Sequence, residues 1–151
     1  MAYTHADGRI IHATSKRFRV LAKVAVKAGD LVYMADSTGI ALATKTTAAT
    51  ALTTAANFVA CENIAIAGTG WCALSVELKA RDTIATGGVV TAGTLCTTAD
   101  IGAALYCGTS GEATSTAPTA GSVVIKQYVG YILSTDRVIL APMQAVIPAV
   151  G

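Results

Sequence analysis

The chain is poor in the residues that build most catalytic and nucleotide-binding sites. Of its 151 residues only 13% are charged and 5% are aromatic, whereas an average soluble domain is about 25% charged. It contains no GxxxxGK[ST] phosphate loop, no GxSxG elbow and no CxxC pair. A hydrolytic triad needs a nucleophile, a base and an orienting group, and both histidines, His5 and His12, lie near the amino terminus. We therefore expect no enzyme activity, cofactor or metal site.

Long apolar runs are also missing. Lys, Asp, Thr or Gly interrupts each apolar stretch well short of the roughly 20 residues that a membrane-spanning helix needs. The opening MAYTHADGRIIH has no charged region followed by an apolar one, as a secretory signal would. We therefore expect no membrane segment and no secretory signal.

One segment matches the relaxed dinucleotide fingerprint GxGxxA. Residues 68–73 read GTGWCA and follow a predicted strand. The fingerprint works only where a helix starts at the turn and directs its N-terminus at a pyrophosphate. The residues after this turn alternate with period two, so we interpret the segment as a β-hairpin turn.

The four cysteines stand at Cys61, Cys72, Cys96 and Cys107. These spacings are too wide for the close cysteine pairs of a usual zinc site. We expect buried free thiols that act as small apolar residues, with one or two disulfides as the alternative.

What the chain does contain is a series of short, alternating segments separated by turn residues. Residues 28–43, AGDLVYMADSTGIALA, indicate two strands joined by a turn over 36–39, where Gly39 permits unusual backbone angles. A looser copy, GAALYCGTSGEAT, occupies residues 102–114. The predicted strands cover residues 17–27, 30–35, 40–43, 58–67, 71–78, 88–91, 94–98, 103–107, 122–133 and 137–140. Many short strands with frequent turns predict an all-β fold, a small barrel or sandwich of short antiparallel strands.

This domain is predicted to cover residues 17–141. Before it, residues 1–16 lack a sustained period and read as an extended N-terminal arm. After it, residues 142–151 read as an irregular C-terminal tail. Within the domain, the Ala- and Thr-rich residues 45–57 are predicted to be a long surface loop, because clustered threonines disfavour a helix.

Basic residues gather at the amino-terminal end. Six of the eleven lie within the first 27 positions, where Asp7 is the only acid. Such a cluster is typical of a solvated, flexible arm or of an arm that docks on an acidic surface. Nucleic acid is a weaker third interpretation, because Tyr3 and Phe18 are the only aromatic residues there for stacking on bases.

Four segments in order carry a family resemblance. They are AGDLVYMADSTGIALA, FVACENIAIAGTGWCALSVEL, GAALYCGTSGEATST and YVGYILSTDRVILAPM. Together they resemble the decoration (cement) proteins of tailed-bacteriophage heads, over residues 27–143. The resemblance implies a β-barrel-like fold, homotrimers on the outside of the capsid, arms that reach neighbouring subunits, and no catalysis.

From this resemblance we expect a structural virion protein, made in the host cytoplasm, whose partners are the major capsid protein and further copies of itself. Our own hypothesis is that Arg9, Lys16, Arg17 and Arg19 dock on the capsid. The alternative is a phage tail or fibre-associated protein, or a carbohydrate-binding module with Trp71 as its aromatic platform. An internal scaffold or nucleic-acid-binding head protein is a third possibility.

Overall fold

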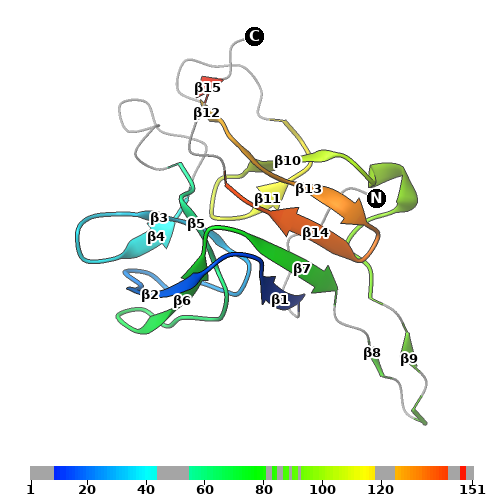
Figure 1. Ribbon diagram of the computed structural model, residues 1–151, viewed down its shortest axis with the longest axis horizontal. Coiled ribbons are helices and arrows are strands. Elements are labelled where there is room, and N and C mark those ends of the chain that lie inside the picture. Colours follow the sequence, from blue (N-terminus) through cyan, green and yellow to red (C-terminus); the bar gives the residue numbers. More distant parts are fainter. Residues whose placement is uncertain are drawn as a thin grey trace.

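The computed structural model is an all-β protein whose two main antiparallel sheets face one another as a sandwich (Figure 1). It describes residues 9–43, 55–80, 83–84, 87–88, 90–91, 93–117, 125–142 and 147–148. The predicted all-β class is confirmed, and of its two forms the structure is the sandwich, because neither sheet closes into a barrel. No helix in these ranges has the length and apolar character needed to span a membrane.

The first sheet has five strands. In sheet order they are β2 (Arg17–Leu21), β6 (Thr69–Ala73), β5 (Phe58–Ala60), β3 (Leu31–Met34) and β4 (Ile40–Leu42). Ala22, the residue after β2, forms an isolated parallel bridge with Ile40 of β4, the strand at the other edge of this sheet.

The second sheet has six strands. In sheet order they are β1 (Arg9–Ala13), β7 (Val76–Ala80), β14 (Arg137–Leu140), β13 (Tyr128–Ser134), β10 (Ala104–Cys107) and β11 (Ala113–Thr114). Two short pairs complete the fold: β8 (Thr83–Ile84) with β9 (Val90–Thr91), and β12 (Ile125–Lys126) with β15 (Ile147–Pro148). The β8–β9 pair projects from one end of the molecule (Figure 1).

The main core lies between the two sheets. Leu31, Val59 and Ala73 of the five-stranded sheet belong to the same buried cluster as Leu78 and Leu140 of the six-stranded sheet. A second cluster covers the opposite face of the five-stranded sheet and includes Ala22, Val26, Val32, Ile40, Ala60, Ile64 and Cys72. The five-stranded sheet is thus buried on both faces, while the six-stranded sheet exposes Tyr131 and Leu133 on its outer face.

Both termini differ from the irregular segments that we predicted. Arg9–Ala13, within the predicted arm, forms β1 at the edge of the six-stranded sheet, where Ile11 and Ala13 pack against the main core. Ile147–Pro148, within the predicted tail, pairs with β12. Such short segments become strands only because a partner strand lies beside them.

Two long predicted strands are also corrected. The strand expected over 17–27 ends at Leu21, and the strand expected over 71–78 is divided between β6 and β7. The break at residues 74–75 reverses the faces, so Cys72 lies in the second cluster while Val76 and Leu78 lie in the main core. Leu74, which lies in this break, is 51% exposed.

The predictions for residues 94–98, 68–73 and 45–57 have different outcomes. The strand predicted over 94–98 is absent; Thr98–Asp100 is instead a 3-10 turn, η1, capped by Asp100, whose carboxylate accepts a hydrogen bond from the Thr97 N–H. The hairpin interpretation of residues 68–73 is confirmed in part, because β6 pairs antiparallel with β5. The turn itself lies earlier than predicted: residues 69–73 are β6, and the Gly68 N–H donates to the Ala65 carbonyl oxygen at 2.8 Å. Most of the loop predicted over 45–57 lies outside the described residues.

The four cysteines are free thiols, as predicted. Three are buried and Cys61 is half-buried. Burial raises the pKa of the Cys72 thiol to about 12, so at neutral pH this side chain is a neutral, small apolar residue of the core.

Candidate functional site: the open basic edge

Strands β1 and β2 form one bent ribbon along the side of the sandwich (Figure 1). β1 pairs with β7 from Arg9 opposite Ala80, and β2 pairs with β6 from Arg17 opposite Ala73. Because β6 and β7 are themselves consecutive, two neighbouring segments of chain cross from one sheet to the other together. Residues 9–16 of the predicted arm, together with β2, therefore form a structural edge that runs from one sheet to the other.

Hydroxyl groups hold the bend between β1 and β2. The Thr14 N–H donates to the Ser75 carbonyl oxygen at 3.1 Å, and the hydroxyls of these two residues lie 2.7 Å apart. The Ser15 hydroxyl accepts hydrogen bonds from the backbone N–H groups of Leu74 and Ser75, at 3.0 and 3.1 Å. These contacts satisfy backbone groups that the bend takes out of the ladder.

Residues 9–19 are named here the open edge. In the described part of the chain, no strand pairs with the outer side of β1 or with β2 up to Arg19. The opposite sheet edges differ: β11 has only two residues, and the Ile40 carbonyl of β4 accepts a hydrogen bond from the Lys23 N–H at 2.9 Å. A long free edge normally invites pairing, and charged side chains are one way that proteins control it.

Two arginines on the open edge surround a tryptophan. The guanidinium carbons of Arg17 and Arg19 lie 5.2 and 5.4 Å from the centre of the Trp71 ring. Arg19 also donates to the Thr69 hydroxyl at 2.7 Å. Each cation–π contact at such an exposed site contributes about 0.5–1 kcal/mol. The two exposed charges are therefore held in a defined position on one face of the strand.

A surface cavity of about 390 Å³ lies beside these arginines. It is lined by Ile11, His12, Ala13, Arg17 and Cys61, and so lies where the bent ribbon passes from one sheet to the other. Burial raises the pKa of the Cys61 thiol, and the positive charge of Arg17 only partly offsets this. The thiol is thus neutral at physiological pH and not activated as a nucleophile.

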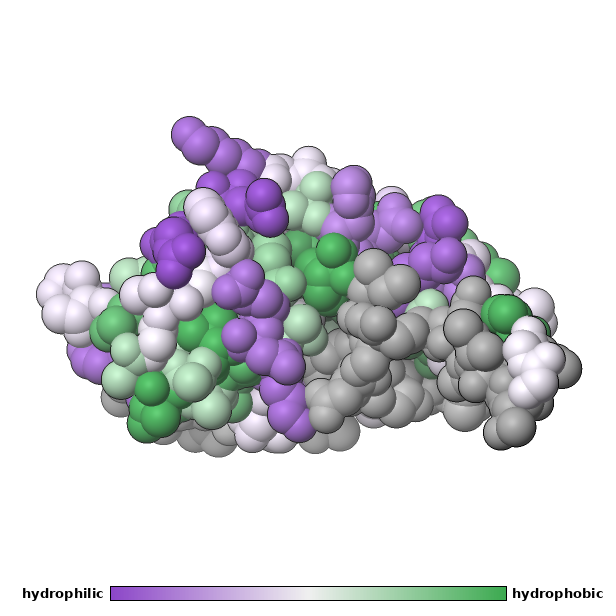
Figure 2. Space-filling model, turned by 90° about the horizontal axis from the view of Figure 1, so that it is seen from below, coloured by the Kyte–Doolittle hydropathy of each residue, from purple (hydrophilic) through white to green (hydrophobic). Residues whose placement is uncertain are grey.

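The face seen from the side of β1, β2 and β6 is chemically mixed. Figure 2 shows hydrophilic side chains that run between hydrophobic patches over this face. A surface of this kind suits a partner that offers both charge and apolar contacts.

Of the four predicted docking residues, the structure brings two together. Arg17 and Arg19 share one face of β2, and Lys16 is exposed in the adjoining bend. The backbone of Arg9 lies on β1, in the other sheet, opposite Ala80. The sequence reasoning missed that Trp71 supports the arginines, because only the register of β2 on β6 places it there.

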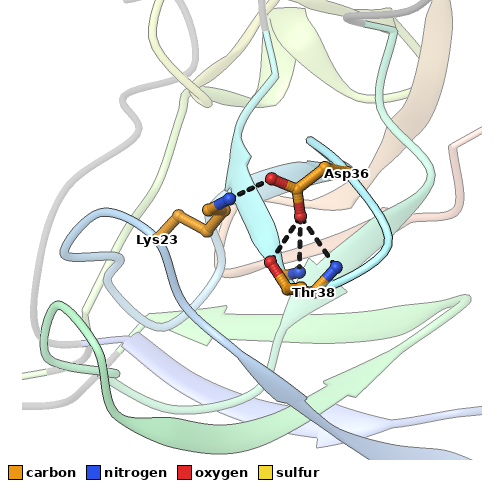
Figure 3. Close-up of polar contacts among 4 residues, drawn as sticks. Lys23, Asp36 and Thr38 are labelled. Carbon is orange, nitrogen blue, oxygen red and sulfur yellow. Dashed lines mark hydrogen bonds and ion pairs between the residues drawn. The ribbon is translucent and has the colours of Figure 1, made fainter.

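A second polar cluster lies in the turn after β3 (Figure 3). Asp36 forms an ion pair with Lys23 and accepts hydrogen bonds from the Thr38 N–H at 2.7 Å and hydroxyl at 2.6 Å. The Lys23 contact, followed by the Thr38 bonds, holds the Asp36 pKa well below its ordinary value. The carboxylate thus fixes the turn through Thr38 and ties it to Lys23, in the segment that follows β2.

No three His, Cys, Asp or Glu side chains in the described ranges are grouped to hold a metal ion. Comparisons with protein-family models, curated proteins and solved structures found no match to this chain. The open edge offers positive charge, an aromatic ring and free backbone groups. Its chemistry is that of binding an anionic or extended partner.

Proposed function

We propose that this chain is a structural virion protein that binds the outside of a tailed-phage capsid and stabilises the head. The observation that carries the proposal is the open edge, where two ordered arginines and a free strand edge face outward. The order of the four resembling segments supports it as well. Those segments make up β3 to β7, β10, β11, β13 and β14, and so most of both sheets.

The low charge of the chain fits this role. With 13% charged residues and 53% hydrophobic residues, much of its surface suits contact with other subunits. A protein that binds only the assembled lattice stabilises it in proportion to the logarithm of its concentration over its dissociation constant. Several copies linked as an oligomer would multiply weak contacts into a durable one.

The carbohydrate-binding alternative is less well supported. Such a module usually presents an open aromatic ring to a sugar, and Trp71 is the only tryptophan. Two guanidinium groups lie over that ring, which leaves less of it available for stacking.

The proposal is tested by sedimenting the protein with undecorated heads of the phage that encodes it. Arg17→Ser with Arg19→Ser should reduce the affinity for heads about tenfold, a loss of about 1.4 kcal/mol. Adding Arg9→Ser and Lys16→Ser should reduce it further. The matched control is Lys126→Ser with Arg137→Ser, which removes the same charge elsewhere on the surface and should leave binding within about threefold.

Two results would contradict the proposal. One is that the wild-type protein does not sediment with heads at any expanded stage. The other is equal loss of binding in the edge variant and in the matched control, which would mean that net charge alone is responsible. Light scattering tests the oligomer separately, where a trimer has about three times the chain mass of 15.2 kDa.

A further inference from the structure

The hydrogen bonds of β6 determine which backbone N–H and C=O groups of β2 point toward β6 and which point outward. The Trp71 carbonyl oxygen accepts a hydrogen bond from the Cys61 N–H at 2.8 Å, so the Trp71 backbone faces away from β2. Arg19 lies opposite Trp71 in the register. In an antiparallel ladder, residues alternate between pairs that exchange hydrogen bonds and pairs that do not. Arg19 is therefore in a pair without hydrogen bonds to β6.

The same alternation gives the orientation of the other backbone groups in β2. The backbone groups of Phe18 and Val20 bond to β6. Ala22, two residues after Val20, follows the same pattern, because its N–H donates to the Gly68 carbonyl oxygen at 2.9 Å. Arg17 and Arg19 direct their N–H and C=O groups to the outer side. The two residues that carry the ordered guanidiniums thus also direct their backbone groups to the side of β2 where, in the described ranges, no strand pairs with them.

The open stretch has a clear limit at its far end. A Cβ placed on Gly39 would lie 2.7 Å from the Leu21 carbonyl oxygen, so the turn before β4 already occupies the outer side of β2 at Leu21. Toward the other end, the bend and the cavity beside Arg17 follow. An added strand would be centred on residues 17–19.

We infer that β2 binds an extended acidic segment of another protein as an added strand, with acidic side chains at alternate positions opposite Arg17 and Arg19. Residues directly opposite in a ladder have Cβ atoms about 4.5–5.5 Å apart. Carboxylates two residues apart project from one face of a strand, as the two guanidiniums do. Both the backbone bonds and the charge pairs then form in a single register.

Charge decides against a second copy of this chain as the occupant. Two β2 strands paired antiparallel across a two-fold axis would bring arginines close to arginines, and like charges directly opposite are destabilising. Arginine on an edge strand can serve merely to prevent such pairing. Here, however, both guanidiniums are also held over Trp71 and one is bonded to Thr69, which prearranges them for a ligand.

This inference goes beyond capsid binding, and it rests on the proposed function only in making a capsid subunit the source of the acidic segment. The test therefore uses no capsid. The probe is a synthetic peptide with Glu at every second position among Thr and Val. The control peptide has the same composition with its Glu residues consecutive, so that its charge is equal but is not aligned with both arginines on one face.

Amide hydrogen exchange followed by NMR reads the added strand directly. Saturation with the alternating peptide should slow exchange at the Arg17 and Arg19 amides by about tenfold or more, because these amides gain hydrogen bonds. The Phe18 and Val20 amides, already bonded to β6, should change little. The consecutive-Glu peptide should bind at least about tenfold more weakly, the equivalent of losing one aligned charge pair.

Two variants separate the contribution of the Arg19 side-chain charge from that of its backbone N–H. Arg19→Ala and Arg19→Pro both remove the guanidinium, but only proline removes the outward N–H. Arg19→Ala should weaken peptide binding, and Arg19→Pro should weaken it at least about fivefold further. Unchanged dispersion of the remaining NMR signals shows that each variant is folded.

Four results would overturn the inference: equal binding of the two peptides, unprotected arginine amides in the peptide complex, equal binding by Arg19→Ala and Arg19→Pro, or slow exchange of the Arg19 amide before any peptide is added. The last would mean that this chain already occupies its own edge. If heads bind while the peptide does not protect these amides, capsid binding stands and strand addition fails. If the peptide binds and heads do not, strand addition stands and the capsid proposal fails.

Discussion

The two ends of the sandwich deal with strand edges in opposite ways. At the closed end, the Leu31 N–H donates to the Gly111 carbonyl and the Gly111 N–H donates to the Ala43 carbonyl, both at 2.8 Å. These bonds join the two copies of the repeated segment, one in each sheet. At the open edge, the chain crosses between the sheets with no further strand paired to its outer side among the described residues, and Arg17 and Arg19 are exposed. One end is joined by backbone hydrogen bonds, whereas the other presents a strand edge that no strand in the described ranges covers.

The two copies of the repeat share more than their sequence pattern. Gly29 and Gly102 precede their strands with φ angles of 89° and 86°. In each turn a carboxylate accepts nearby backbone N–H groups: Asp36 from Thr38, and Glu112 from residues 109 and 110. Both copies of the repeat are thus stabilised by turns whose carboxylates bond to nearby backbone groups, and the turn of the second copy lies at the closed end. We expect changes there to reduce stability, and changes at the open edge to reduce binding.

The largest effect on stability is expected at Gly111. Its φ is +78°, and an added Cβ would lie 2.8 Å from the Leu42 Cδ2 atom and 3.0 Å from the Leu31 carbonyl oxygen. Gly111→Ala should therefore cost about 2–4 kcal/mol, the sum of left-handed backbone strain and overpacking. Urea denaturation measures this free energy of unfolding.

Gly102→Ala is the matched control. Its φ of +86° is similar, but no atom lies within 4 Å of the added Cβ. Only backbone strain remains, about 1 kcal/mol. If both variants lose the same stability, the contact between the two repeats does not hold the closed end together.

Proline substitutions in β2 are expected to reduce stability by a smaller amount, and the size of the loss should alternate from one residue to the next. Val20→Pro removes an N–H that bonds to β6, so it should cost about 1–3 kcal/mol more than Val20→Ala. Arg19→Pro removes an outward N–H and should cost less than about 1 kcal/mol more than Arg19→Ala. Thermal or urea denaturation of the four variants measures both differences. The reverse order would show that the backbone directions assigned to the open edge are wrong.

The carboxylate of Asp36, in the turn after β3, makes the stability of the five-stranded sheet depend on pH. Because its pKa is lowered by folding, its charged form stabilises the protein above the ordinary aspartate pKa of about 3.9, and this contribution is lost as pH falls below that value. Asp36→Asn should lower the melting temperature at pH 7, and its difference from wild type should shrink toward pH 2. Lys23→Ser, which removes the ion-pair partner, should reproduce part of this change. If the difference in melting temperature stayed constant with pH, the charged Asp36 carboxylate would not be what stabilises the turn.

The two copies of the repeat were largely predictable from the sequence, and the open edge was not. Glycines and turn residues around positions 29, 39 and 102 act locally, so residues 28–43 were predicted as two strands and a turn. The bent ribbon depends on contacts between distant residues, such as Thr14 with Ser75 and Arg19 with Thr69. Period-two alternation predicts a strand but gives neither its partner nor its register, which is why Trp71 was not assigned to the arginines.

The smallest effect concerns Trp71, and it offers the most selective probe. Since this is the only tryptophan in the chain, its fluorescence reports on the open edge alone. Removing either guanidinium by Arg17→Ser or Arg19→Ser uncovers part of the ring, so acrylamide should quench the emission more strongly while stability changes by less than about 1 kcal/mol. Lys126→Ser, whose cation lies over Tyr106 and Tyr128 instead, should leave the quenching unchanged. If the arginine variants also leave it unchanged, the guanidiniums do not rest on the ring in solution. The open edge would then carry mobile charges that prevent self-pairing, and the ordered acidic partner would lose its main physical support.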